Sequence, residues 1–153
     1  MRIAVVADHN GVAFKSRVIS ALREAGHSVD DRGVATDEVV DYPVLCFDAC
    51  EQVVDGRADR AIVIGGTGSG ESMVCNKIAG IRAIVCQQEM VARISRQNND
   101  SNVLVLGAKV ISADLGIEII DVWLRTDFTG GRHAERLAQM VAVERGERLT
   151  RSD

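Results

Sequence analysis

Short apolar runs alternate along this chain with segments in which apolar residues recur every three or four positions. The first pattern predicts buried strands, and the second predicts helices that bury one face. The predicted strands cover residues 1–7, a short stretch around Val29, 61–64, 81–86 and 103–106. The predicted helices cover residues 14–25, 42–54, the segment from a glycine-rich turn to about Asn76, 91–98 and 113–124. Strands that alternate with helices predict an α/β fold with a five-stranded parallel sheet covered on both faces.

The last predicted helix follows Gly130-Gly131 and differs from the others. Its apolar side, which runs from Ala134 to Val141, includes few large residues. A helix with so small a core face is predicted to pack on a neighbouring subunit. We therefore expect one domain over residues 1–143, followed by a charged, frayed tail over 144–153.

The third predicted strand breaks into a glycine-rich turn, Gly65-Gly66-Thr67-Gly68-Ser69-Gly70, which ends on Glu71 at the expected start of a helix. Glycines permit positive φ and a close approach of the backbone to a ligand, so several N–H groups can converge on one anionic oxygen. A carboxylate beside such donors is suited to moving a proton. A nucleotide-binding loop matches less well, because the turn lacks Gly-Lys-Ser/Thr and Glu71 replaces the last glycine of a dinucleotide fingerprint. A plain tight turn, with Glu71 capping the helix, is the structural alternative.

Two further polar segments extend the candidate site. Asp8-His9-Asn10-Gly11 follows the first strand, and residues 97–102 form the loop at the end of the fourth helix. Because ligands bind beyond the carboxyl ends of parallel strands, the first segment and the glycine-rich turn are predicted to share one rim, which 97–102 joins less directly. Each segment has a plain alternative: an N-cap for Asp8-His9 and a helix stop for 98–102.

Arg132 and Arg136 lie one turn apart on the last predicted helix. Side chains at this spacing project together and can grip a phosphate from two sides. The alternative is a solvated, charged helix face.

Composition narrows the class of protein. The 153 residues, 46% of them hydrophobic, suffice for one substantial core. A net charge of -4 argues against a non-specific nucleic-acid binder. The four cysteines show no CxxC spacing and are each expected to be small buried residues, so no metal site is predicted. Neither a signal peptide nor a membrane span is evident, which predicts a reduced, cytoplasmic location.

Taken in order, several of these segments resemble the type B ribose-5-phosphate isomerase family, which includes the galactose-6-phosphate isomerase subunits and allose-phosphate isomerases. The similar stretches are residues 8–11, 41–43, 65–71, 76–83, 95–103 and 130–133. The resemblance implies a Rossmann-like three-layer α/β/α sandwich, a homodimer or homotetramer with sites shared across an interface, and no metal or cofactor. It also implies interconversion of phosphorylated aldoses and ketoses, in which a base moves the proton beside the carbonyl by way of an enediolate.

The resemblance also assigns roles to single residues. One branch of the family has a cysteine base at the position of Gly65, and the other has a glutamate at the position of Glu71, which makes Glu71 the expected base here. The resemblance implies that the enediolate oxygens are held by Thr67, Gly68, Ser69, Gly70 and Asn99. It also implies that Asp8 binds the sugar hydroxyls or relays protons between them. It further implies that the phosphate is bound by His9, Arg132 and Arg136, and that the two arginines come from the neighbouring subunit. The remaining expected pocket residues are Tyr42, Gly66, Asn98, His133 and Lys109, the last standing where many relatives have a phosphate-binding arginine.

Asn98 departs from the family pattern. Many members have a histidine at this position that is assigned to opening the furanose ring, whereas an asparagine cannot carry a proton near neutral pH. The favoured hypothesis is a pentose-phosphate isomerase that relies on spontaneous opening, or on His9 or His133. A second hypothesis is an isomerase of acyclic tetrose phosphates, such as erythrulose 4-phosphate and erythrose 4-phosphate. A third is a non-catalytic sugar-phosphate-binding subunit of a heteromer, against which the presence of Glu71 argues.

Overall fold

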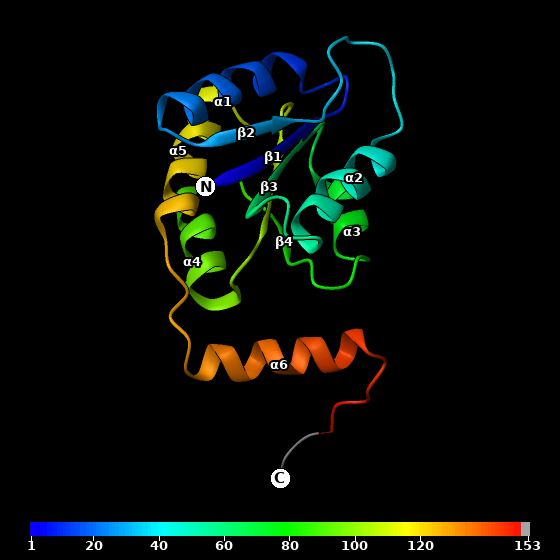
Figure 1. The fold of residues 1–153 in the computed structure, drawn as a ribbon, viewed down its shortest axis with the longest axis vertical. Coiled ribbons are helices and arrows are strands. Elements are labelled where there is room, and N and C mark those ends of the chain that lie inside the picture. Colours follow the sequence, from blue (N-terminus) through cyan, green and yellow to red (C-terminus); the bar gives the residue numbers. More distant parts are fainter. Residues whose placement is uncertain (151–153) are drawn as a thin grey trace.

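A computed structural model describes residues 1–150 of the chain. Its centre is a sheet of five parallel strands in the order β2-β1-β3-β5-β4 (Figure 1). The strands are β1 (Arg2–Ala7), β2 (Ser28–Asp31), β3 (Arg60–Gly65), β4 (Ala83–Val85) and β5 (Val103–Gly107). The register pairs Ala7 with Ile64 and Gly65 with Gly107, so the segments that follow β1, β3 and β5 leave the sheet at the same edge.

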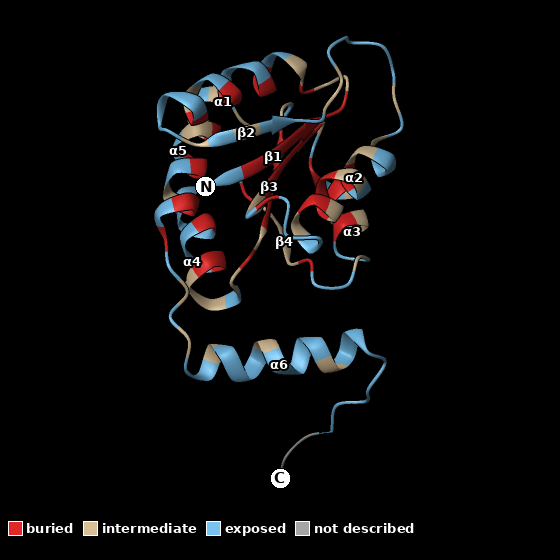
Figure 2. Ribbon diagram, viewed as in Figure 1, coloured by how far each residue is buried: buried red, intermediate tan, exposed pale blue. Residues whose placement is uncertain are grey.

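Helices cover both faces of this sheet and give three layers (Figure 1). The helices α1 (Val12–Glu24), α4 (Glu89–Asn99) and α5 (Ala113–Arg125) share one core with the side chains of Ile3, Val5, Ile62 and Leu104. The helices α2 (Tyr42–Val54) and α3 (Ser69–Cys75) share the other core with Ala4, Val6, Val63 and Val105. Successive strand residues alternate between the two cores, and the continuous apolar runs are therefore buried on both sides, as in Figure 2. The predicted α/β architecture is confirmed.

One predicted strand is shorter than expected. Residues 81–86 were predicted as a strand, but β4 covers only Ala83–Val85. Gly80 has a positive φ of 83°, and the N–H of Ile81 donates to the carbonyl of Ile78, so a turn occupies the start of the predicted segment. Ile81 is buried because this turn packs on the core, which explains its strand-like pattern.

The helix α6 (Arg132–Glu144) stands apart from the three layers and has no buried residue (Figure 2). A groove of about 980 Å³ separates it from the body and is lined by residues of α6, α4 and β4. The predicted packing of this helix on a neighbouring subunit stays a prediction, as does the domain limit at residue 143. The helix ends one residue beyond that limit, residues 145–150 are exposed, and the final part of the predicted tail, 151–153, lies outside the described residues.

No helix within residues 1–150 is long and apolar enough to cross a membrane.

Candidate active site

The glycine-rich turn forms a tight connection between β3 and α3. Gly68 adopts φ 84° and ψ -11° and caps α3, a left-handed conformation that glycine tolerates best. The N–H of Ser69 donates to Thr67 Oγ1 over 3.3 Å. A Cβ on Gly107 would lie 2.7 Å from the carbonyl oxygen of Thr67, so the end of β5 passes directly beneath the turn. The turn is thus held from below, and within residues 1–150 no hydrogen bond occupies the N–H groups of Gly70 and Glu71, which follow Ser69 at the start of α3 and can serve a ligand.

Glu71 occupies a space that Gly65 leaves free. A Cβ built on Gly65 would lie 1.7 Å from Glu71 Oε1 and 2.2 Å from its Cδ. The side chain therefore folds back over the end of β3 and is only 6% exposed. This contact puts a carboxylate at the base of the turn, where the chain can present it to a bound molecule. It also means that residue 65 cannot carry a side chain while Glu71 keeps this position.

The Asp8–Gly11 segment lies against the same turn. Asp8 is 5% exposed, and its N–H donates to the carbonyl of Ile64 over 3.1 Å. Its carboxylate accepts from the N–H of Asn10 at 2.8 Å and from Asn10 Nδ2 at 3.0 Å. Asn10 Nδ2 also lies 3.2 Å from His9 Nε2. Asn10 therefore orients both Asp8 and His9.

Asn10 is a residue whose part in the site the sequence analysis missed. A Cβ on Gly66 would meet Asn10 Nδ2 at 3.5 Å, which places this amide beside the glycine-rich turn. Its signal was its place in the Asp8–Gly11 segment, in which the sequence analysis gave roles to Asp8 and His9 but none to Asn10.

Tyr42 and Lys109 complete this edge. The Tyr42 hydroxyl lies 2.5 Å from the position of a Cβ on Gly70, so the ring covers the turn from the α2 side. Lys109 follows β5, donates its N–H to the carbonyl of Gly66 over 2.9 Å, and brings its Cδ within 3.7 Å of a Cβ on Gly66. The structure thus brings together the predicted residues Asp8, His9, Tyr42, Gly66, Thr67, Gly68, Ser69, Gly70, Glu71 and Lys109.

The predicted location of 97–102 at this rim is wrong for a single protomer. The helix α4 runs antiparallel to the strands, so its end at Asn99 lies at the opposite edge, where β5 begins. The N–H of Arg82 donates to Asn102 Oδ1 there over 2.8 Å, and Asn99 lines the groove together with Arg136 of α6. The predicted residues therefore form two groups. The second group is Asn98, Asn99, Arg132, His133 and Arg136.

The cysteines lie in the core and not at either group. Cys46, Cys50, Cys75 and Cys86 are all free and at most 1% exposed. Hydrogen bonding to Cys75 and burial raise the pKa of the Cys46 and Cys50 thiols, and burial raises the pKa of Cys86 to about 12. The expectation that all four cysteines are small buried residues is confirmed. Within residues 1–150, no cluster of three His, Cys, Asp or Glu side chains could hold a metal ion.

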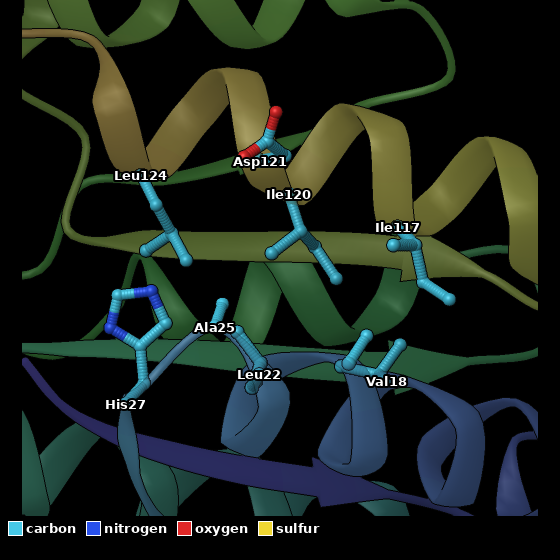
Figure 3. A pocket seen from close by; sticks show the side chains of 9 residues that line it. Val18, Leu22, Ala25, His27, Ile117, Ile120, Asp121 and Leu124 are labelled. Atoms are coloured by element: carbon cyan, nitrogen blue, oxygen red, sulfur yellow. The ribbon is translucent and has the colours of Figure 1, made fainter.

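A smaller hollow of about 170 Å³ lies between α1 and α5 (Figure 3). Its walls are apolar, with Leu22, Ile120 and Leu124 among them, and His27 and Asp121 supply its polar groups. Partial burial and the nearby N-terminal ammonium group lower the pKa of His27. This hollow contains neither a glycine-rich turn nor any residue of the two predicted groups, so it is not the candidate active site.

A buried carboxylate at a glycine-rich turn, at the carboxyl edge of a parallel α/β sheet, suits an enzyme that moves a proton beside an anionic oxygen. Sequence comparison identifies the family within that class. The sequence pattern of the Ribose/Galactose Isomerase family matches residues 3–140, and the chain belongs to this family. The chain is therefore an enzyme, an isomerase.

Individual relatives cover almost the whole chain. Ribose-5-phosphate isomerase B of Escherichia coli is 41% identical over 143 residues, which are 94% of this chain and 96% of the relative. The structure of Clostridium thermocellum ribose-5-phosphate isomerase B is similar with a TM-score of 0.94 and 42% identity, covering 95% of this chain and 99% of that chain. A D-erythrulose-4-phosphate isomerase of Pectobacterium atrosepticum is 34% identical over 149 residues, 97% of this chain and 98% of the relative.

Proposed function

We propose that this isomerase interconverts phosphorylated aldoses and ketoses, with ribose 5-phosphate and ribulose 5-phosphate as the preferred pair and Glu71 as the base. The observation that carries the proposal is the contact of the Glu71 carboxylate with Gly65, at the foot of a turn rich in N–H donors. The relatives of E. coli and C. thermocellum, both named as ribose-5-phosphate isomerases, support the choice of substrate. Free cysteines support a reducing compartment, and we place the enzyme in the cytoplasm.

The proposed chemistry moves one proton between adjacent carbons. Glu71 takes the proton from C2 of the open-chain aldose, and the electron pair of that C–H bond forms the enediolate double bond while the carbonyl oxygen becomes the oxyanion. The N–H groups of the glycine-rich turn stabilise this oxyanion. Glu71 then returns the proton to C1, and Asp8 exchanges the hydroxyl proton between the two oxygens. Neither a redox cofactor nor a metal is needed for this balance.

In this proposal, His9 binds the phosphate together with Arg132 and Arg136 of the group at the opposite edge, and Asn99 of that group supplies the second contact to the enediolate. Asn99, Arg132 and Arg136 lie away from Glu71 in one protomer, so a complete site requires a second copy of the chain. The exposed apolar side chains Val44, Phe47 and Met73, on α2 and α3 near the glycine-rich turn, support such a contact. They complement the groove beside α6, whose own Met140 and Val143 are exposed. The proposed assembly is a homodimer, which a homotetramer would contain twice.

Mixed dimers test the shared site. Glu71→Gln and Arg136→Ala are each expected to be inactive as homodimers, whereas the two chains co-expressed with different tags should regain about a quarter of the wild-type activity. Half of the random dimers are mixed, and each of these has one intact site of two. Sites built within one protomer would give no recovery, and this result would contradict the shared site.

Proton NMR in heavy water tests the reaction itself. We expect the purified chain to exchange the proton beside the carbonyl of ribose 5-phosphate and to form ribulose 5-phosphate. Binding of phosphosugars without any exchange would instead support a non-catalytic subunit of a heteromer.

The alternative substrate is a tetrose phosphate. Asn98 replaces the ring-opening histidine of many family members, and a four-carbon phosphate closes no furanose ring, so it needs no such histidine. The similarity to a D-erythrulose-4-phosphate isomerase favours this alternative. Running the same NMR experiment with four-, five- and six-carbon pairs decides the matter, because exchange confined to erythrose and erythrulose 4-phosphates would replace the pentose proposal.

A further inference from the structure

The second group of site residues comes from two segments that are far apart in the sequence. Asn98 and Asn99 end α4, whereas Arg132 and Arg136 lie on α6. For both to serve one substrate, the corner after α4 and the start of α6 must keep a fixed relation. The helix α6 has no buried residue to fix it, and its far end is held by a 2.9 Å hydrogen bond from the N–H of Gly80 to Glu144 Oε1.

Arg96 joins the two segments from inside. It is only 6% exposed, unlike most arginines of the chain. Its Nη1 lies 2.7 Å from Asp100 Oδ1 and donates to the carbonyl of Ser101 over 2.6 Å, which holds the corner after α4. Its Nε donates to the carbonyl of Thr126 over 3.3 Å, which holds the linker between α5 and α6. One planar guanidinium thus bonds both segments at once.

A second connection lies next to the first. Thr129 donates to the carbonyl of Gln97 through its N–H at 3.0 Å and through its hydroxyl at 2.7 Å. Gln97 directly precedes Asn98, and Thr129 stands three residues before Arg132. These bonds connect the same two segments as Arg96 does, one residue further along α4 and three residues further along the linker.

The corner itself needs support. Asp100 has φ 45° and ψ 45°, a left-handed conformation that is unfavourable for a residue with a side chain. Arg96 and Arg82 both bind its carboxylate, Arg82 at 3.0 Å, and Arg82 Nε also donates to the carbonyls of Asn99 and Asp100. This network satisfies the corner's polar groups and sets the direction of Asn99.

We propose that Arg96 is a positioning residue that fixes the Asn98–Asn99 corner and the α5–α6 linker as one unit, so that the amide and the phosphate-binding arginines reach the site in a fixed relation. This inference rests on the proposed function of Asn99, Arg132 and Arg136. A lysine cannot replace Arg96, because one ammonium group has no planar fork to reach Asp100, Ser101 and Thr126 together.

Arg60 offers a matched control. It is also partly buried, and its Nη1 donates to the carbonyls of Trp123 and Leu124 at 2.9 and 3.2 Å, while its guanidinium lies 5.0 Å from the Trp123 ring centroid. It thus binds the end of α5 much as Arg96 binds the residue after it. Within the described residues no hydrogen bond joins Arg60 itself to the corner, which it reaches through Trp123, whose Nε1 donates to Ser101 Oγ over 2.8 Å. Arg60→Lys should lower the melting temperature and leave KM unchanged.

The experiment compares Arg96→Lys, Arg60→Lys and the wild type by kcat, KM, melting temperature and calorimetric binding of inorganic phosphate. We expect Arg96→Lys to raise KM and weaken phosphate binding about tenfold, with a smaller fall in kcat. Thr129→Val, at an exposed position, should raise KM in the same direction by about threefold even if Arg96→Lys fails to fold. The inference is overturned if KM and phosphate affinity are unchanged in Arg96→Lys. If Arg96→Lys fails to fold, the same result in Thr129→Val overturns it. A rise of KM in Arg60→Lys as large as in Arg96→Lys would also overturn it. Phosphate binding can be measured without turnover, which separates the two proposals. If the wild type binds phosphate but isomerises no sugar, only the proposed function is refuted. If the wild type binds no phosphate, both the proposed function and the role of Arg96 are refuted.

Discussion

Glu71→Gln should lower the rate of proton exchange at the substrate carbon by about 10²- to 10⁴-fold, the range that a positioned acid–base group contributes. Glutamine has nearly the same shape, so it can occupy the same space above Gly65 without disturbing the turn. Its amide can neither take the proton from C2 nor return it to C1, and these are the two steps that the proposal assigns to Glu71. Affinity for phosphate should stay nearly intact, because the proposed phosphate ligands lie elsewhere.

The measurement is isotope exchange by NMR, combined with calorimetric binding of inorganic phosphate. Glu24→Gln is a matched control, since Glu24 is an exposed carboxylate at the end of α1 and should retain full activity. If Glu71→Gln turns over as fast as the wild type, Glu71 is not the base.

The fold could be predicted from the sequence because each local pattern agreed with the final packing. The run that ends at Ala7 and the run before Gly65 are buried on both faces, and only a sheet between two layers of helices buries them so. The strand predicted over residues 81–86 was too long, because the pattern of buried residues begins in the turn before β4 (Ala83–Val85). Burial is what periodicity reports, and a turn packed on the core is buried without being a strand.

The site could be predicted only in part, for a geometric reason. Asp8 and the glycine-rich turn both follow strands, so the topology of a parallel sheet placed them at one edge. The 97–102 segment lies at the end of a helix, and a helix between two parallel strands returns along the sheet and ends at the opposite edge. The position of Asn99 at that edge therefore followed from the predicted parallel topology, and the error lay in grouping the segment by its polar residues.

Contacts between side chains and distant backbone were beyond reach of the sequence. The carbonyls that Arg96 binds belong to Ser101 and Thr126, and carbonyls carry no residue-specific signal. The contact of Glu71 with Gly65 was missed as well, because the sequence analysis interpreted the glycines of the turn by their backbone freedom. The structure shows that Gly65 matters for its missing side chain, since its φ is not positive.

That missing side chain leads to the second large expected effect. Gly65→Ala should reduce activity to the level of Glu71→Gln while leaving the fold nearly as stable as before. The three atoms nearest to the new Cβ would all be Glu71 atoms, at 1.7, 2.2 and 2.9 Å, and these belong to a flexible side chain that can swing away. Gly107→Ala is the contrasting control, because its Cβ would meet backbone atoms of Thr67 at 2.7 to 3.0 Å. Gly107→Ala should lower the free energy of unfolding by about 1–3 kcal/mol. Thermal melts, measured together with the exchange assay, distinguish this loss of stability from the loss of activity expected for Gly65→Ala.

The contact between Glu71 and residue 65 predicts that the two bases assigned in this family, a cysteine at residue 65 and a glutamate at residue 71, exclude each other. Gly65→Cys alone should be inactive at neutral pH, because the thiol and the Glu71 carboxylate compete for one space. Gly65→Cys combined with Glu71→Ala removes the competitor, and we expect it to regain part of the exchange activity. A thiol ionises near pH 8.5 when unperturbed, whereas a glutamate ionises near 4.3, so the regained activity should rise with pH across the range from about 7 to 9. A double variant no more active than Glu71→Ala alone would show that space at residue 65 is not what separates the two branches.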